Sequence, residues 1–141
     1  MVTKSVVRAG IASGLAAFAL ALTAAPAQAA VDRDVEFQND CPHPVRVLIA
    51  HAYDQDTWDA HGWYEFEASE ASVQLEDNDS PLLQRDDHPL YLYAESTDGS
   101  DIFWEGSEHY ETFDDVRYGM KKAVLEVVSG DIHVRLTCEG Y

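Results

Sequence analysis

Two segments near opposite ends of the chain alternate apolar and polar residues. In residues 35–41, Val35, Phe37 and Cys41 occupy odd positions, and acids and amides lie between them. In residues 132–138, every even position is apolar and every odd position is polar. A period of two is typical of strands with one buried face. The pattern predicts that the first and last strands lie close together, with Cys41 and Cys138 both in the core-facing phase.

Between these ends the chain returns repeatedly to short runs typical of strands. Turn-forming residues separate the runs, and Ser129-Gly130 is expected to form a tight hairpin before the last strand. Residues 114–122 are the one place where a helical turn is expected, although Gly119 weakens it. So many short strands predict an all-β fold, an antiparallel sandwich or a small barrel. The expected strands are 44–53, 62–67, 71–75, 90–95, 102–104, 109–113 and 122–128.

The first 29 residues have the pattern of a cleavable signal peptide. Lys4 and Arg8 precede an apolar, alanine-rich run over residues 9–25, and Ala27-Gln28-Ala29 matches a small-residue cleavage site. The run is too short and too rich in alanine to favour a membrane anchor. We therefore expect one exported β domain over residues 30–141, periplasmic or secreted, with no stable membrane span after cleavage.

The chain of 141 residues holds only two cysteines. Export brings them into an oxidising compartment, where thiols in adjacent strands form disulfides. The strand phases therefore predict a bridge between Cys41 and Cys138, and two unpaired buried thiols are the alternative.

The charge balance is strongly acidic. Aspartate and glutamate number 26 against 9 lysines and arginines, a net charge of −17, and Lys4 and Arg8 leave with the signal peptide. Such a chain repels phosphate backbones, so we expect no nucleic-acid partner. Solubility in a saline or crowded exterior explains the acidity, and calcium binding is the alternative.

The chain carries several short motifs: FQNDC at 37–41, PVRV at 44–47, Trp58, GWY at 62–64, YLYAE at 91–95, WEG at 104–106, RYGMKK at 117–122 and VVSG at 127–130. In this order and spacing they resemble the DUF1036 family of small exported bacterial proteins. The family has no established biochemical activity, so the resemblance implies a class and no reaction. Relatives usually carry further cysteines, which are missing from residues 68–71 and 107–110 here, so the pairing of Cys138 rests on its strand phase alone.

The densest aromatic cluster contains Trp58, Trp63, Tyr64 and Phe66. Aromatic faces on a β scaffold bind sugar rings, with neighbouring acids as hydrogen-bond acceptors. The alternative is a core cluster, because Trp63 lies on one face of the expected strand while Tyr64 and Phe66 lie on the other. Ligand binding by Trp58, Trp63 and Tyr64 is kept as a hypothesis.

Asp54, Asp56 and Asp59 place carboxylates at close spacing after an expected strand. Calcium prefers six to eight oxygen ligands, so this loop is a candidate calcium site. An EF-hand loop beginning at Asp54 needs glycine where Asp59 stands, so a solvated loop is the competing interpretation. Apart from calcium, no cofactor is expected.

The six histidines are scattered, with no zinc-binding spacing, and we expect them at the surface. Convergence of some of them in space is left open. They are His43, His51, His61, His88, His109 and His133.

Enzymatic activity is not expected. The chain has no nucleophile-elbow motif, and a bridge between the cysteines leaves no free thiol nucleophile. The sequence therefore favours a non-catalytic binding or envelope-associated module whose ligand and partner it does not identify. A calcium-dependent or carbohydrate-binding module is the alternative, and a small hydrolase comes third.

Overall fold

Strands and turns make up the residues that the computed structural model describes, 29–52 and 57–139. This confirms the all-β prediction, while the expected signal peptide falls, except for Ala29, outside the described residues. No helix in these two stretches is long and apolar enough to cross a membrane. The strands are β1 (Asp32–Asn39), β2 (Val45–Ala52), β3 (Trp58–Phe66), β4 (Val73–Gln74), β5 (Glu76–Asp77), β6 (Ser80–Pro81), β7 (Leu83–Arg85), β8 (Tyr91–Ser96), β9 (Phe103–Trp104), β10 (His109–Phe113), β11 (Val116–Lys122), β12 (Leu125–Val128) and β13 (Asp131–Leu136).

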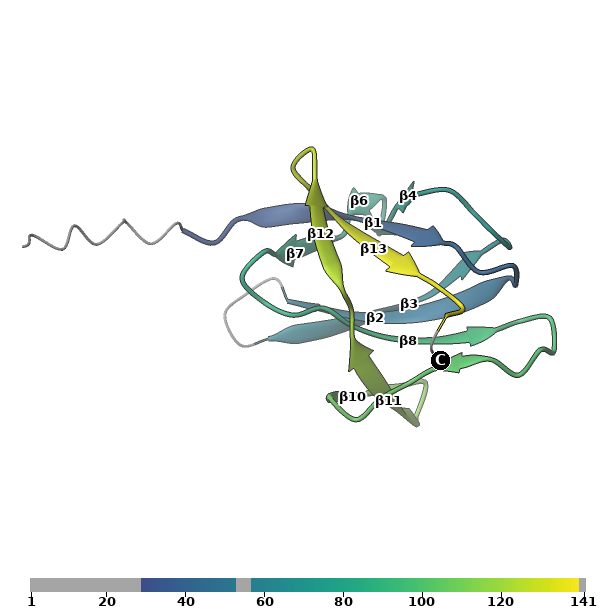
Figure 1. The fold of residues 1–141 in the computed structure, drawn as a ribbon. Coiled ribbons are helices and arrows are strands. Elements are labelled where there is room, and N and C mark those ends of the chain that lie inside the picture. The colour runs from purple at the N-terminus through teal and green to yellow at the C-terminus, as the bar shows by residue number, and fades with distance from the viewer. Residues whose placement is uncertain (1–28, 53–56, 140–141) are drawn as a thin grey trace, which may run out of the picture.

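Two sheets form the layers of a sandwich (Figure 1). One has the order β12-β13-β1-β4, and β7 also pairs with β1. The other has the order β10-β11-β8-β2-β3, and β9 also pairs with β8, while β5 and β6 form a separate small hairpin. Every pairing is antiparallel except that of β1 with β13. The sandwich is therefore mostly antiparallel, as predicted.

The first and last strands lie side by side, which confirms the prediction from their matching phases. They run parallel, with Val35 opposite Ile132 and Phe37 opposite Val134, and these four side chains are at most 1% exposed. Just beyond them Cys41 and Cys138 form a disulfide with Cα atoms 5.1 Å apart. The two ends of the described domain are thus joined by backbone hydrogen bonds and by a covalent bond.

Strand β2 is buried on both faces because it lies between β8 and β3 and its residues are almost all apolar. Val45, Val47 and Ile49 pack into the core between the two sheets. Leu48 and Ala50 point to the opposite face, where Tyr93 and Met120 join them. A sheet covered on both sides needs a further layer over that second face.

The β10–β11 hairpin supplies this layer, curling below the β2-β3-β8 sheet in Figure 1. Its turn residues Asp114 and Asp115 have φ of 50° and 62°, and two successive left-handed residues build the tight turn that joins antiparallel strands. The expected helical turn at 114–122 is therefore wrong. The hairpin expected at Ser129-Gly130 is confirmed, with φ of 55° and 106° and β12 paired to β13.

Hydrogen bonds to exposed aspartates stabilise two other turns. Asp98 accepts hydrogen bonds from His43 Nδ1 at 2.8 Å and from the Ser100 amide at 3.0 Å. The bond from His43, followed by those from Ser100, lowers the pKa of Asp98 to about 2. Bonds from Arg85 and then His88 likewise lower the pKa of Asp87 to about 2.

These shifts predict a loss of stability in acid. A carboxyl group whose pKa is about 2 when folded and about 3.9 when unfolded stabilises the fold above pH ~4, and this contribution disappears as the pH falls through 2. Asp98→Asn should therefore lower the melting temperature slightly at pH 5, and the difference from the parent should close near pH 2. Melting curves at both pH values test this, with Glu126→Gln at an exposed position of β12 as the control. A difference for Asp98→Asn that does not vary with pH would contradict the assignment.

Candidate metal centre

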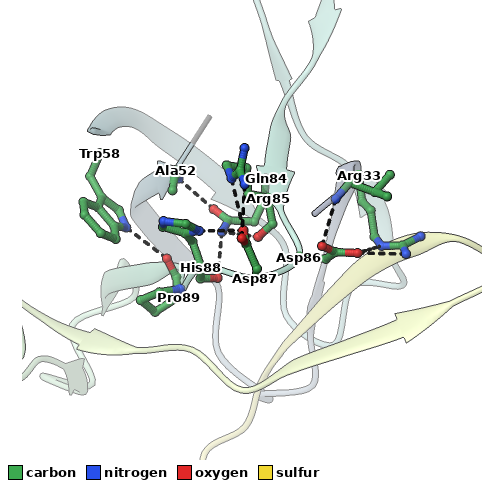
Figure 2. A network of polar contacts seen from close by, with 10 residues as sticks. Arg33, Ala52, Trp58, Gln84, Arg85, Asp86, Asp87, His88 and Pro89 are labelled. Atoms are coloured by element: carbon green, nitrogen blue, oxygen red, sulfur yellow. Dashed lines mark hydrogen bonds and ion pairs between the residues drawn. The ribbon is translucent and has the colours of Figure 1, made fainter. Parts of the chain in front are cut away.

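Residues 83–89 hold together the ends of β2 and β3 on either side of the segment 53–56. Gln84 is fully buried. Its Oε1 accepts a hydrogen bond from the Ala52 amide at 2.8 Å, and its Nε2 donates to the carbonyl oxygens of Arg85 and His88 at 2.8 and 2.9 Å (Figure 2). Trp58 Nε1 donates to the Pro89 carbonyl at 2.9 Å, also drawn in Figure 2. A buried amide with these partners fixes the backbone around it, since leaving any of them unmet would be costly.

The register of β2 against β3 brings two histidines and one aspartate to the same face. His51 lies directly opposite Asp59, and His61 follows Asp59 by two residues on the same strand. Directly opposed residues, and residues two apart on one strand, point to the same side of a sheet. His61 is also opposite Ile49, whose side chain packs between the two sheets. The cluster therefore occupies the inner face of the sheet, at its end.

One ligand atom from each of these three side chains lies within 4.8 Å of the other two. His61 Nε2 is 3.3 Å from Asp59 Oδ2, and the rings of His51 and His61 are 4.9 Å apart between centroids. His51 is 6% exposed, while the side chains of His61 and Asp59 are 20% and 58% exposed. The cluster thus runs from a buried nitrogen to a carboxylate at the surface.

The prediction that the histidines lie at the surface is wrong for His51. Its Nδ1 lies 2.5 Å from the Leu83 carbonyl, and its pKa is lowered, because burial disfavours the charged ring more than that hydrogen bond favours it. The ring is therefore neutral at neutral pH. A neutral imidazole is the form that binds metal ions.

A bulge in β3 places His61 and Tyr64 on one face. Val47 is opposite Tyr64 while Ile49 is opposite His61, so Gly62 and Trp63 together face the single residue Leu48. Gly62 has φ of 148°, and a Cβ there would lie 2.7 Å from the Val47 carbonyl oxygen. The position therefore requires glycine. Beyond the bulge the alternation is inverted, and even-numbered residues take the inner face that Asp59 and His61 occupy before it.

The three aromatic residues of the ligand hypothesis do not form one surface. Tyr64 packs against the core between the sheets, and its hydroxyl donates to the Glu76 carbonyl at 3.2 Å. Burial, with a smaller effect from the Asp77 carboxylate, raises the pKa of Tyr64 to about 12. Trp58 and Trp63 instead pack against the second cluster, on the opposite face.

Both tryptophans make their ring contacts within the protein. The Arg46 guanidinium lies 4.3 Å from the centre of the Trp63 ring, a position that a bound sugar ring would need. Trp58 lies within 6.0 Å of three other rings, and Trp63 within 6.4 Å of three. These contacts favour the core interpretation of the cluster over carbohydrate binding. The rings around Trp58 are His88, Tyr91 and His109, and those around Trp63 are Tyr93, Phe113 and Tyr118.

Only one of the predicted calcium ligands can be placed. Asp54 and Asp56 belong to the segment 53–56, outside the described residues. Asp59 faces two imidazoles. The sequence did not indicate this, because strand pairing brings the histidines together and no local spacing encodes that pairing. His51 and His61 are thus site residues that the sequence reading did not bring together.

A cavity of about 190 Å³ opens beside His61. The β5–β6 hairpin forms part of its wall through Glu76 and Asp77, and Tyr64 forms another part. Asp77 Oδ1 lies 3.5 Å from His61 Nδ1, the ring nitrogen not facing Asp59. His61 therefore lies between two carboxylates, one on its own strand and one on the hairpin.

Comparison with known protein families, with curated proteins and with solved structures finds no match to this chain.

Proposed function

We propose that the chain is an exported, non-catalytic binding module of the DUF1036 type, periplasmic or secreted, and that its ligand is a divalent cation held by His51, Asp59 and His61. The observation that carries the proposal is the convergence of three ligand side chains, from two paired strands, within 4.8 Å of one another. Export is supported by the leader pattern and by the disulfide between Cys41 and Cys138.

The distances in the cluster suit a metal ion. Two ligands that bind one tetrahedral ion at 2.0–2.1 Å are separated by about 3.3 Å, and His61 Nε2 and Asp59 Oδ2 are 3.3 Å apart. The three ligand atoms lie within 4.8 Å of one another, so the wider separations must close by up to about 1.5 Å when all three bind the same ion. Rotation of the exposed Asp59 side chain costs little, whereas the buried His51 is held by Leu83. We therefore expect Asp59 to move toward the histidines.

The surrounding charge also favours a cation. The acidic excess of the whole chain draws cations toward its surface. Asp77 adds a second carboxylate next to His61. A neutral His51 beside them supplies a ligand that a proton does not already occupy.

Metal binding should be visible as stabilisation. Zn²⁺ added to the oxidised, chelator-treated protein at a free concentration 100-fold above Kd should raise the free energy of unfolding by about 2.7 kcal/mol. His61→Ala should abolish most of this gain, because it removes one of three ligands. Titration calorimetry and melting curves with Zn²⁺ measure both effects, and Ca²⁺ is titrated in parallel.

His133→Ala is the matched control for general attraction of cations to an acidic surface. His133 Nε2 lies 3.3 Å from Glu36 Oε2, and the side chain is 22% exposed, so it resembles His61 in both respects. This variant should bind Zn²⁺ as the parent does. Equal binding by the parent and His61→Ala, or no stabilisation by any divalent ion, would refute the proposed function.

A further inference from the structure

We infer that the site selects a nitrogen-preferring transition-metal ion of the Zn²⁺ or Cu²⁺ class over Ca²⁺, and that Asp77 is the positioning residue that aims His61 at the ion. The inference rests on the proposed function and names its ligand class. It depends on the hydrogen-bonding geometry of the two imidazoles and on the rigidity of the hairpin that carries Asp77.

The hydrogen bond to Leu83 fixes which ring nitrogen of His51 can bind an ion. A carbonyl oxygen can only accept a hydrogen bond, so His51 donates its Nδ1–H to Leu83. The lone pair then resides on Nε2. Because β7 fixes the Leu83 carbonyl through its pairing with β1, the ring is held as an Nε2 ligand.

Asp77 has the same effect on His61. Its Oδ1 lies 3.5 Å from Nδ1, whereas Asp59 Oδ2 lies 3.3 Å from Nε2. When an ion occupies the Asp59 side, the ring proton belongs on Nδ1, and a slight closure of the ion pair with Asp77 lets its carboxylate accept that proton as a hydrogen bond. Histidines that bind metals commonly donate their other N–H to a carboxylate in this way, which fixes the ring and raises its basicity.

The hairpin places Asp77 independently of the ion. Asp77 pairs with Ser80 across a tight turn, and Asn78 Nδ2 donates to Asp77 Oδ1 at 3.0 Å. At the base of the hairpin, the Leu82 amide donates to the Leu75 carbonyl at 2.8 Å, and both leucine side chains are 2% exposed. The Tyr64 hydroxyl adds a bond to Glu76. The hairpin backbone is thus held at several points and the carboxylate by Asn78, so Asp77 is placed to orient the neighbouring ring.

The ligand types decide the class of ion. Two of the three converging ligands are imidazole nitrogens, which bind Zn²⁺, Cu²⁺ and Ni²⁺ well. Calcium prefers six to eight oxygens. We therefore expect Cu²⁺ and Zn²⁺ to bind more tightly than Co²⁺, and Ca²⁺ and Mg²⁺ to compete poorly at millimolar concentration.

Asp77→Asn tests the positioning role. The variant keeps the size of the side chain and removes the charge that accepts the His61 proton, so the affinity for Zn²⁺ should fall about 10-fold. Asp79→Asn removes a carboxylate charge two residues further along the same turn, where φ of 62° suits asparagine. This variant should leave the affinity for Zn²⁺ unchanged. Asp77→Glu should restore part of the loss. Competition with a chromogenic chelator measures all four proteins.

NMR of the histidine ring nitrogens separates positioning from mere structural support. In the Zn²⁺-loaded parent, His51 and His61 should both carry the proton on Nδ1 and bind through Nε2. In the Asp77→Asn variant the Nδ1–H signal of His61 should shift or broaden while that of His51 stays in place. The melting temperature of the metal-free variant should match that of the parent.

These measurements separate the role of Asp77 and the class of ion from the existence of the cation site. Zn²⁺ binding that is identical in Asp77→Asn and the parent overturns the role of Asp77 and leaves the cation site standing. Ca²⁺ binding as tight as Zn²⁺ binding, lost in His61→Ala, overturns the ion class alone. Failure of Cu²⁺, Zn²⁺ and Ca²⁺ to bind overturns both.

Discussion

Replacing Cys41 and Cys138 together by alanine should lower the free energy of unfolding by about 4–5 kcal/mol. The bridge joins residues separated by 97 positions, so it closes a loop that includes most of the described domain. Such a loop greatly restricts the unfolded chain, because the entropy that a cross-link removes grows with loop length. For a domain of this size the loss corresponds to a melting temperature lower by about 15–20 °C. Denaturant unfolding at fixed pH measures the change.

Alanine is chosen because Cys41 is fully buried and a serine hydroxyl there would add a penalty of its own. The parent protein, unfolded after reduction by dithiothreitol, is the control for the loss of two sulfur atoms. Reduced parent and double variant should agree to within about 1 kcal/mol. A reduced parent as stable as the oxidised one would show that the paired strands β1 and β13 hold the ends together without the bond.

The strands and their turns could be predicted from the sequence because both signals are local. Alternation over a few residues marks a half-buried strand, and the dipeptide Ser129-Gly130 accepts the left-handed backbone that a two-residue turn requires. The closeness of β1 and β13 followed from the matching phases of their cysteines. Their parallel direction did not follow, since phase carries no information on direction.

The turn at Asp114-Asp115 shows where local reading failed. Gly119 lowers helix propensity, and β-strand pairing with β10 and β8 decides the segment. Aspartate enters the left-handed region more readily than most residues. Two successive aspartates therefore form a turn here, although aspartate is also favoured at the start of a helix.

The candidate site depends on non-local features. His51 and His61 are brought together by the register of β2 against β3, which has no local signature in the sequence. The bulge at Gly62 also inverts the alternation of faces along β3. The apolar and polar pattern of 62–67 correctly assigns Trp63 and Tyr64 to opposite faces. It does not show that Tyr64 shares a face with His61. The sequence predicts Asp59 as a candidate calcium ligand, with Asp54 and Asp56 as its partners. Three carboxylates close together in the sequence indicate a site made of oxygen ligands. The pairing of β2 with β3 instead brings two histidine rings to Asp59.

Phe37→Ala should destabilise the domain by about 3–5 kcal/mol. Phe37 is fully buried, and its ring stacks on that of Phe66 with centroids 4.4 Å apart. It lies on β1 between Val134 of β13 and Val73 of β4, while Phe66 belongs to the opposite sheet. Truncation therefore leaves a cavity where the two layers meet, and the disulfide prevents the ends of the domain from moving apart to relieve it. Denaturant unfolding of the oxidised variant measures the loss.

Phe103→Ala is the matched control, because Phe103 is 46% exposed on β9 and its truncation should cost about 1 kcal/mol or less. The two phenylalanines differ in the area that leaves water on folding, so the comparison isolates burial from the chemical change. Equal costs at the two positions would mean that the space left by Phe37 collapses without a cavity, and the contact with Phe66 would then contribute little to holding the layers together. Zn²⁺ affinity should survive both substitutions, since Phe37 lies on β1 and Phe103 on β9, whereas the proposed ligands lie on β2 and β3. A fall in affinity for Phe37→Ala alone would show that the spacing of the two sheets sets the geometry of the metal centre.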